Sequence, residues 1–189
     1  DPPLKGLLSP FPFPLSPFAF FLGGYLIPLF KPSLGEEELD LLREVFRSGW
    51  LGLGPRTAEF EQKFADYVGA GHAVGVSSCT AALHLSLGLL DLKPGDEVIV
   101  PAITFVSTAH AVVYCGAKPL FADVQPDTLC IDVKDVQQKV TDRTRAILPV
   151  HYGGHPCDMD EIHPVAASRG IMGLRQVAPP ARPRHVRQG

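Results

Sequence analysis

The stretch KPGDEVIVPAITFVSTAHAVVYCGAKPLFADV, residues 93–124, decides the fold. It opens with the turn KPGD, and the apolar run EVIVP follows at residues 97–101. A helical pattern then covers about residues 105–114, and a second strand-like run, KPLFADV, covers residues 118–124. Continuous apolar runs are typical of parallel strands that are buried between two layers of helices. The stretch therefore predicts a strand–helix–strand unit within a parallel sheet.

The same alternation continues on both sides of this stretch. HAVGV at residues 72–76 predicts a short strand, and the apolar residues 80–90 predict a helix. Further along, residues 133–140 predict a polar helix, and RAILPV at residues 145–150 predicts another strand. Together these elements predict an α/β protein with a three-layer α/β/α sandwich. Ligands of such sheets bind beyond the carboxyl ends of the strands. The positions expected there are residues 77–80, 101–105, 123 and 151–154.

Two amphipathic helices are expected before the sheet. Ser33 and Glu36 fit a capping box, from which a helix runs to Gly49, and a second helix ends at Gly69. Each helix carries one apolar stripe, which we expect to face the core. The stripes are Leu39, Leu42, Val45 and Phe46 in the first helix, and Phe60, Phe64, Tyr67 and Val68 in the second.

Small and hydroxyl-bearing residues, Ser77, Ser78, Cys79 and Thr80, precede the buried helix at residues 80–90. The first turn of a helix has N–H groups without intrahelical acceptors and the positive end of the helix dipole, so an anion such as a phosphate fits there. Ser and Thr are also favoured as ordinary N-caps. The residues alone leave both interpretations open.

The composition is that of a globular protein, with 46% hydrophobic and 20% charged residues and a net charge of −3. The four cysteines show no C-x-x-C spacing, which fits reduced thiols in a cytoplasmic protein. Residues 1–29 form a Pro- and Phe-rich extension. Its uncharged run is long enough for a membrane span, but its prolines would interrupt a helix, so we expect disorder and no membrane anchor. Residues 171–189 form an Arg- and Pro-rich tail that we expect to be unrelated to the domain.

Three segments carry a resemblance to a known family. They are SGWLGLGPRTAEFEQKFADYVG (48–69), SSCTAALHLSLGLLDLKPGDEVIVPAITFVSTAHAVVYCGAKPLFADV (77–124) and TRAILPVHYGGHPCDMDEI (144–162). In this order they resemble the DegT/DnrJ/StrS aminotransferases, which are fold-type-I enzymes that use pyridoxal 5'-phosphate. The resemblance implies that residues 30–170 are part of the large domain of such an enzyme.

The resemblance also assigns roles to single residues. It implies that Ser78, Cys79 and Thr80 hold the cofactor phosphate and that Phe105 stacks on the pyridine ring. Trp50 and Gly52 lie in a loop that the family uses near the substrate, and they are weaker candidates. The family implies a nucleotide-linked keto sugar as substrate, an amino donor such as glutamate, and a homodimer.

The chain departs from the family pattern at its carboxyl end. Family members continue with a strand that ends in an acidic partner of the pyridine nitrogen and, later, with the lysine that forms the Schiff base. Here residues 171–189 match neither feature, and no lysine follows Lys139. We therefore expect an incomplete enzyme without catalytic residues that is inactive by itself.

Other functions are less consistent with the residues. A non-catalytic fragment that pairs with a full-length homologue is the main alternative. Nucleic-acid binding by the arginines of the tail would be non-specific, so no nucleic-acid partner is expected. The segment HYGGHPCDMD, residues 151–160, contains His, Cys and Asp, but its glycines prevent a helical ligand pair and no second ligand group follows. No metal site is expected.

Overall fold

The computed structural model describes residues 19–22, 25–28, 33–173 and 176–177. The chain divides into two units, residues 1–73 and residues 74–189, where the sequence had predicted one unit over residues 30–170. Each unit is therefore treated by itself. The remaining residues of the extension and of the tail lie outside the described part of the chain, and so do most of the predictions made for them.

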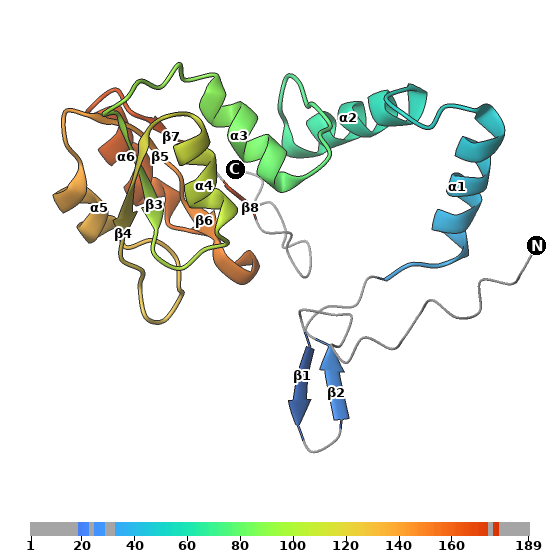
Figure 1. The fold of residues 1–189 in the computed structure, drawn as a ribbon, viewed down its shortest axis with the longest axis horizontal. Coiled ribbons are helices and arrows are strands. Elements are labelled where there is room, and N and C mark those ends of the chain that lie inside the picture. Colours follow the sequence, from blue (N-terminus) through green and yellow to red (C-terminus); the bar gives the residue numbers. More distant parts are fainter. Residues whose placement is uncertain (1–18, 23–24, 29–32, 174–175, 178–189) are drawn as a thin grey trace, which may run out of the picture. The chain divides into compact units, whose positions relative to one another are not determined.

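The described residues of the first unit form two strands and two helices. Strands β1 (Ala19–Leu22) and β2 (Tyr25–Pro28) pair in antiparallel fashion, although disorder was expected for this part of the extension. Helix α1 covers Glu36–Ser48 and helix α2 covers Pro55–Val68 (Figure 1). Both helices end at the predicted glycines.

The predicted capping box of α1 does not form, and the N-cap lies two residues after the predicted one. The N-cap is Gly35, and its N–H donates to the carboxylate of Glu38 at 2.6 Å. Ser33 and Glu36 therefore do not form the pair that the sequence suggested. Three consecutive glutamates offer more than one capping partner, and the extended backbone of Gly35 (φ −142°) selects the last of them. Such an alternative is not visible in the spacing alone.

The apolar stripes of α1 and α2 do not face a core, contrary to the prediction. Helix α1 has no buried residue and α2 buries only Ala65. Phe46 and Tyr67 are each 70% exposed, and Phe60 is 59% exposed. The described residues of this unit contain no further layer that could cover the stripes. Helical periodicity predicts which residues share a face, but it does not show whether another layer packs against that face.

The second unit is built on a four-stranded sheet with the order β4-β3-β5-β7. All neighbouring strands in it are parallel. A separate short parallel pair joins β6 and β8. The strands are β3 (Glu97–Pro101), β4 (Lys118–Ala122), β5 (Thr144–Ile147), β6 (Val150–His151), β7 (Met172–Gly173) and β8 (Gln176–Val177).

Helices cover both faces of this sheet (Figure 1). They are α3 (Cys79–Gly88), α4 (Ser107–Tyr114), α5 (Val133–Lys139) and α6 (Met159–Ala167), and a short 3-10 turn covers Tyr152–Gly154. Val98 and Val100 of β3 pack with α3 and α4, whereas Ile99 packs with α5 and α6. Because neighbouring residues of one strand enter opposite cores, the predicted three-layer α/β/α sandwich is confirmed.

Two boundaries of this unit differ from the prediction. Residues 72–76 form no strand; Val74 is 79% exposed and Val76 is 40% exposed. The sheet also continues past the predicted limit at Gly170. Ile171 is buried in the core with α5 and α6, and β7 pairs with β5. The strand is only two residues long, too short to produce a readable hydrophobic pattern.

A buried carboxylate lies at the amino-terminal end of β3. Glu97 is 3% exposed, and its carboxylate accepts hydrogen bonds from Thr141 Oγ1 at 2.6 Å and from Arg143 Nη2 at 3.0 Å. The Thr141 hydroxyl makes the largest contribution to lowering the pKa of Glu97 below its ordinary value of 4.5, and Arg143 lowers it further against the opposing effect of burial. The ionised form is thus the stabilised one.

We expect Glu97→Gln to lower the free energy of unfolding at pH 7 by about 1–3 kcal/mol, because an amide cannot replace the charged acceptor. Because the pKa of Glu97 is lower in the folded state, its carboxylate stabilises the fold at pH values above the ordinary pKa. This stabilisation is lost as the pH falls through the folded-state pKa. The difference between wild type and variant should therefore shrink below about pH 4.5. Urea unfolding at several pH values measures this, with Asp127→Asn, an exposed carboxylate, as control. A difference that grows at low pH would contradict the assignment.

Candidate functional site

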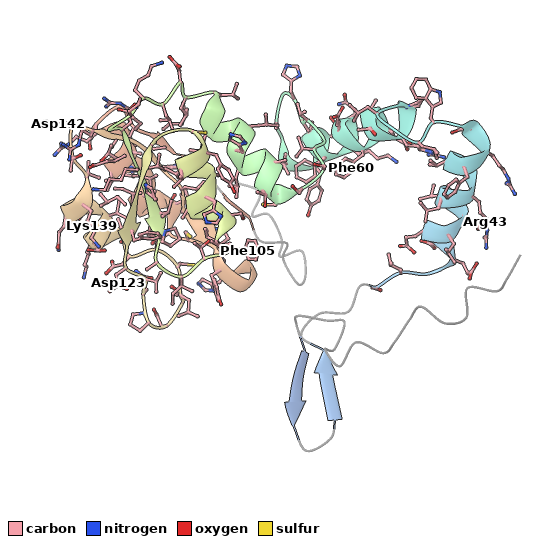
Figure 2. All side chains as sticks on the ribbon, viewed as in Figure 1. Arg43, Phe60, Phe105, Asp123, Lys139 and Asp142 are labelled. Carbon is pink, nitrogen blue, oxygen red and sulfur yellow. The ribbon has the colours of Figure 1, made fainter. Side chains whose placement is uncertain are left out.

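The carboxyl ends of the parallel strands lie at one edge of the sheet. Figure 2 shows Phe105, which follows β3, and Asp123, which follows β4, at this edge, and Asp142, which precedes β5, at the opposite edge. The carboxyl edge is where ligands bind in open α/β sheets. It therefore contains two of the positions that the sequence predicted as ligand-binding.

Helix α3 begins in the predicted segment of small residues. Ser78 is the N-cap in an extended conformation, and its hydroxyl oxygen accepts from the Ala81 N–H at 3.1 Å. The first intrahelical bond runs from the Ala82 N–H to the Ser78 carbonyl at 3.0 Å. The N–H groups of Cys79 and Thr80 thus belong to the set that a helix cannot pair internally. Ser78 and Cys79 are exposed and Thr80 is half-buried, so an anion has access to this turn.

Phe105 lies in the loop between β3 and α4, and its side chain is 64% exposed. The loop is attached to the sheet by the Ala102 N–H, which donates to the Ala122 carbonyl at 2.7 Å. At its other end the Thr108 N–H donates to the Phe105 carbonyl at 3.0 Å. The ring is consequently presented to solvent on a backbone that is fixed on both sides. A flat ligand could stack on it.

Asp123 has a structural role in the chain itself. Its backbone N–H donates to the carboxylate of Asp135 at 2.6 Å, and that carboxylate also accepts from Lys139 Nζ at 2.7 Å. The Lys139 ammonium makes the largest contribution to lowering the pKa of Asp135, followed by the Asp123 N–H. Lys139 additionally donates to the Phe121 carbonyl at 2.9 Å. The ammonium of Lys139 is thus committed to the end of β4 and to α5.

The segment at residues 151–160 is held by thiol and imidazole contacts. His151 Nδ1 accepts from the Cys157 N–H at 3.0 Å, and Cys157 Sγ donates to the Val150 carbonyl at 3.1 Å. Burial, with a smaller contribution from the neighbouring Cys130, raises the pKa of Cys157 to about 12, so this thiol is a poor nucleophile near neutral pH. Among the described residues, no three His, Cys, Asp or Glu side chains gather in a way that could hold a metal ion.

Trp50 and Gly52 belong to the first unit. They line a hollow of about 420 Å³ between α1 and α2, to which Glu44 and Arg56 also contribute. Arg56 pairs with Glu44 and with Glu59. Arg56 was not predicted from the sequence to line this hollow. The signal was its place next to Pro55, at the start of α2 and close to the loop of Trp50 and Gly52.

The structure thus places the predicted cofactor residues and the predicted substrate residues in different units. Ser78, Cys79, Thr80 and Phe105 all belong to the second unit, and Trp50 and Gly52 belong to the first. In the described part of the chain, no helix has both the length and the apolar character needed to cross a membrane.

Comparison with known proteins identifies one aminotransferase family. The model of the DegT/DnrJ/EryC1/StrS aminotransferase family matches residues 32–178. The spore coat polysaccharide biosynthesis protein SpsC of Bacillus subtilis (strain 168) is 47% identical over 154 residues, which are 82% of this chain and 40% of that protein. This chain therefore spans about two-fifths of the length of that curated relative.

Solved structures agree with this match. The aminotransferase TlmJ from Streptoalloteichus hindustanus is 46% identical with a TM-score of 0.74, and the match covers 80% of this chain and 42% of that one. The PLP-form of the putative sugar aminotransferase Spr1654 from Streptococcus pneumoniae is 37% identical with a TM-score of 0.73, covering 77% and 37% of the two chains. Both structures support a fold-type-I architecture for this chain.

Proposed function

Because the chain belongs to the DegT/DnrJ/EryC1/StrS aminotransferase family, which depends on pyridoxal phosphate, we propose that it supplies the phosphate-binding and ring-stacking part of a sugar aminotransferase site. The observation that carries this proposal is the amino end of α3, where the accessible first turn lies in the segment to which the family resemblance assigns the cofactor phosphate. The intact site would move an amino group from a donor such as glutamate to a nucleotide-linked keto sugar, in a homodimer.

The residues present fit the phosphate end of the cofactor. The N–H groups of Cys79 and Thr80 and the hydroxyl of Thr80 are donors, and the helix dipole adds a positive field. Ser78 Oγ accepts from Ala81, but its own O–H remains a donor. Cys79 contributes its backbone and not thiol chemistry. The cap and the phosphate site, which the sequence left as alternatives, are therefore compatible with each other.

Phe105 fits the ring end of the cofactor. When bound, pyridoxal phosphate supplies an electron-poor ring that withdraws electrons from the amino-bearing carbon. The exposed face of Phe105 would orient this ring by stacking, which is worth about 0.5–1.5 kcal/mol beyond the burial of area. Trp50 and Gly52 remain candidates for contact with the sugar substrate.

We expect these 189 residues to bind the cofactor without transaminating. The described lysines are engaged elsewhere or exposed: Lys63 pairs with Glu59, Lys93 pairs with Asp91, and Lys139 is bound to Asp135. No lysine lies in a segment that matches the family's catalytic lysine.

The comparison of pyridoxal 5'-phosphate with pyridoxal, which lacks the phosphate, tests the proposal. We expect pyridoxal to bind at least about tenfold more weakly, since hydrogen bonds to a charged group contribute about 1.5–3 kcal/mol. Calorimetric titration of the purified chain with each compound measures this. Thr80→Val should reduce the preference for the phosphorylated compound, whereas Thr128→Val, a half-buried threonine in a turn elsewhere in the unit, should not. Equal affinities for both compounds would contradict a phosphate site.

A further inference from the structure

We propose that Thr108, acting through Thr104, is a positioning residue that holds the Phe105 ring in place for the cofactor. The inference rests on the proposed function, because it gives Phe105 its stacking role. It concerns two hydroxyls whose residues precede and follow Phe105 in the chain, at the carboxyl edge of the sheet. Neither threonine would touch the cofactor in this assignment.

The position of the Phe105 ring depends on contacts made by other residues of its loop. With 64% of its side chain exposed, the ring has few packing partners of its own. An exposed ring that must be ordered for stacking loses rotamer freedom, and a backbone that had to be ordered at the same time would add a second cost to binding. Fixing the loop before the ligand arrives therefore increases affinity.

The two threonine hydroxyls form a hydrogen bond that fixes this loop. Thr104 Oγ1 and Thr108 Oγ1 lie 2.8 Å apart, within hydrogen-bond distance, and enclose Phe105 between them in the chain. The Thr108 N–H donates to the Phe105 carbonyl at 3.0 Å, so the same residue holds the loop by backbone and by side chain. The hydroxyl bond thus joins the two ends of the five-residue segment from Thr104 to Thr108.

One end of this closure is rigid. Thr108 is 0% exposed and lies in the first turn of α4, whose Ala111 and Val112 are fully buried against the sheet. Thr104 is only half-buried and lies in the loop itself. The hydroxyl pair thus ties a loop residue to a core residue. Without the pair, the loop would keep its attachments at Ala102 and at the Phe105 carbonyl but lose the link between Thr104 and Thr108.

The test uses variants of the 189-residue chain and pyridoxal 5'-phosphate as the probe. Thr108→Val and Thr104→Val each remove one hydroxyl at nearly constant volume, and Thr108→Ser retains the hydroxyl. We expect either valine variant to weaken binding by about three- to tenfold, because each loses the bond between the two hydroxyls, and Thr108→Ser to stay within about twofold of wild type. In a Phe105→Ala background the valine substitutions should have no further effect.

A purely structural role would give a different pattern. If Thr108→Val leaves the affinity unchanged, or lowers it equally in the Phe105→Ala background, the positioning role is wrong. Thermal unfolding identifies a variant that has simply lost its fold, and Thr104→Val then provides the test because Thr104 lies outside the core.

Amide hydrogen exchange separates this inference from the proposed function. If the wild-type chain binds no pyridoxal 5'-phosphate, the proposed function fails, and exchange of the residue 108 amide decides whether the closure exists. We expect this amide to exchange at least about threefold faster in Thr104→Val than in wild type, because its bond to the Phe105 carbonyl opens more often. An unchanged exchange rate would overturn the inference whatever the cofactor affinity.

Discussion

Replacing Ile147 by alanine is expected to lower the free energy of unfolding of the second unit by about 2–5 kcal/mol. Ile147 is 0% exposed and lies in β5, between β3 and β7, where it packs into the core with α5 and α6. The substitution removes buried methyl and methylene groups and leaves a cavity that the surrounding strands cannot fill. For an open sheet with few strands, this is a large fraction of the total stability.

Circular dichroism in increasing urea is the suitable measurement. Intrinsic fluorescence is not, because Trp50, the single tryptophan of the chain, belongs to the first unit. The control is Leu89→Ala, since Leu89 is 86% exposed at the end of α3 and its substitution should change stability by no more than about 0.5 kcal/mol. A loss below about 1 kcal/mol for Ile147→Ala would show that the core around β5 is not packed as described.

The second large effect concerns covalent attachment of the cofactor. We expect borohydride reduction of the chain with pyridoxal 5'-phosphate to fix the cofactor on no single lysine in stoichiometric amount. Nucleophilic attack needs an unprotonated amine that faces the cofactor aldehyde. Lys139 donates instead to Asp135 and to the Phe121 carbonyl, at 2.7 and 2.9 Å. Lys118 and Lys134 are exposed, and Lys5 and Lys31 lie outside the described residues.

Peptide mass spectrometry after reduction gives the result directly. Weak labelling of several exposed lysines should be equal in wild type and in Phe105→Ala, because it does not depend on the site. Stoichiometric labelling of one lysine that disappears in Phe105→Ala would mean that these residues contain a complete attachment site. In that case the expectation of an inactive chain would be wrong.

The sheet was predictable because the sequence around β3 marks where this strand begins and ends. The turn at residues 93–96 and the continuous apolar run at residues 97–101 fix the position of β3, and the structure has this strand at the predicted residues. Burial on both faces follows from the same run, since Val98 and Ile99 enter opposite cores. A continuous apolar pattern is thus sufficient where helices cover both faces of a strand.

Elements that depend on a distant partner were not predictable. HAVGV has the composition of a strand, yet no strand of the described chain pairs with it, and Val74 and Val76 are exposed. The stripes of α1 and α2 have helical periodicity but no covering layer among the described residues. Composition reports the preference of a segment, while hydrogen bonding and packing require a second surface.

The candidate site was predictable in part. The start of a helix within residues 77–80 and the place of Phe105 after β3 agree with the structure. The hydroxyl pair of Thr104 and Thr108 was not found, because the helix was expected from about residue 105 and begins at Ser107. An error of two residues at a helix start changes which side chains lie together at the loop.

The position of the bound cofactor tests the central claim most directly. Nuclear magnetic resonance of the ¹⁵N-labelled chain, titrated with pyridoxal 5'-phosphate, reports which backbone amides sense the ligand. We predict that the largest shifts fall on Cys79, Thr80 and Phe105, and that they are smaller in Phe105→Ala. Shifts that are confined to the hollow around Trp50, or that are absent at the amino end of α3, would contradict a phosphate-binding and ring-stacking site in the second unit.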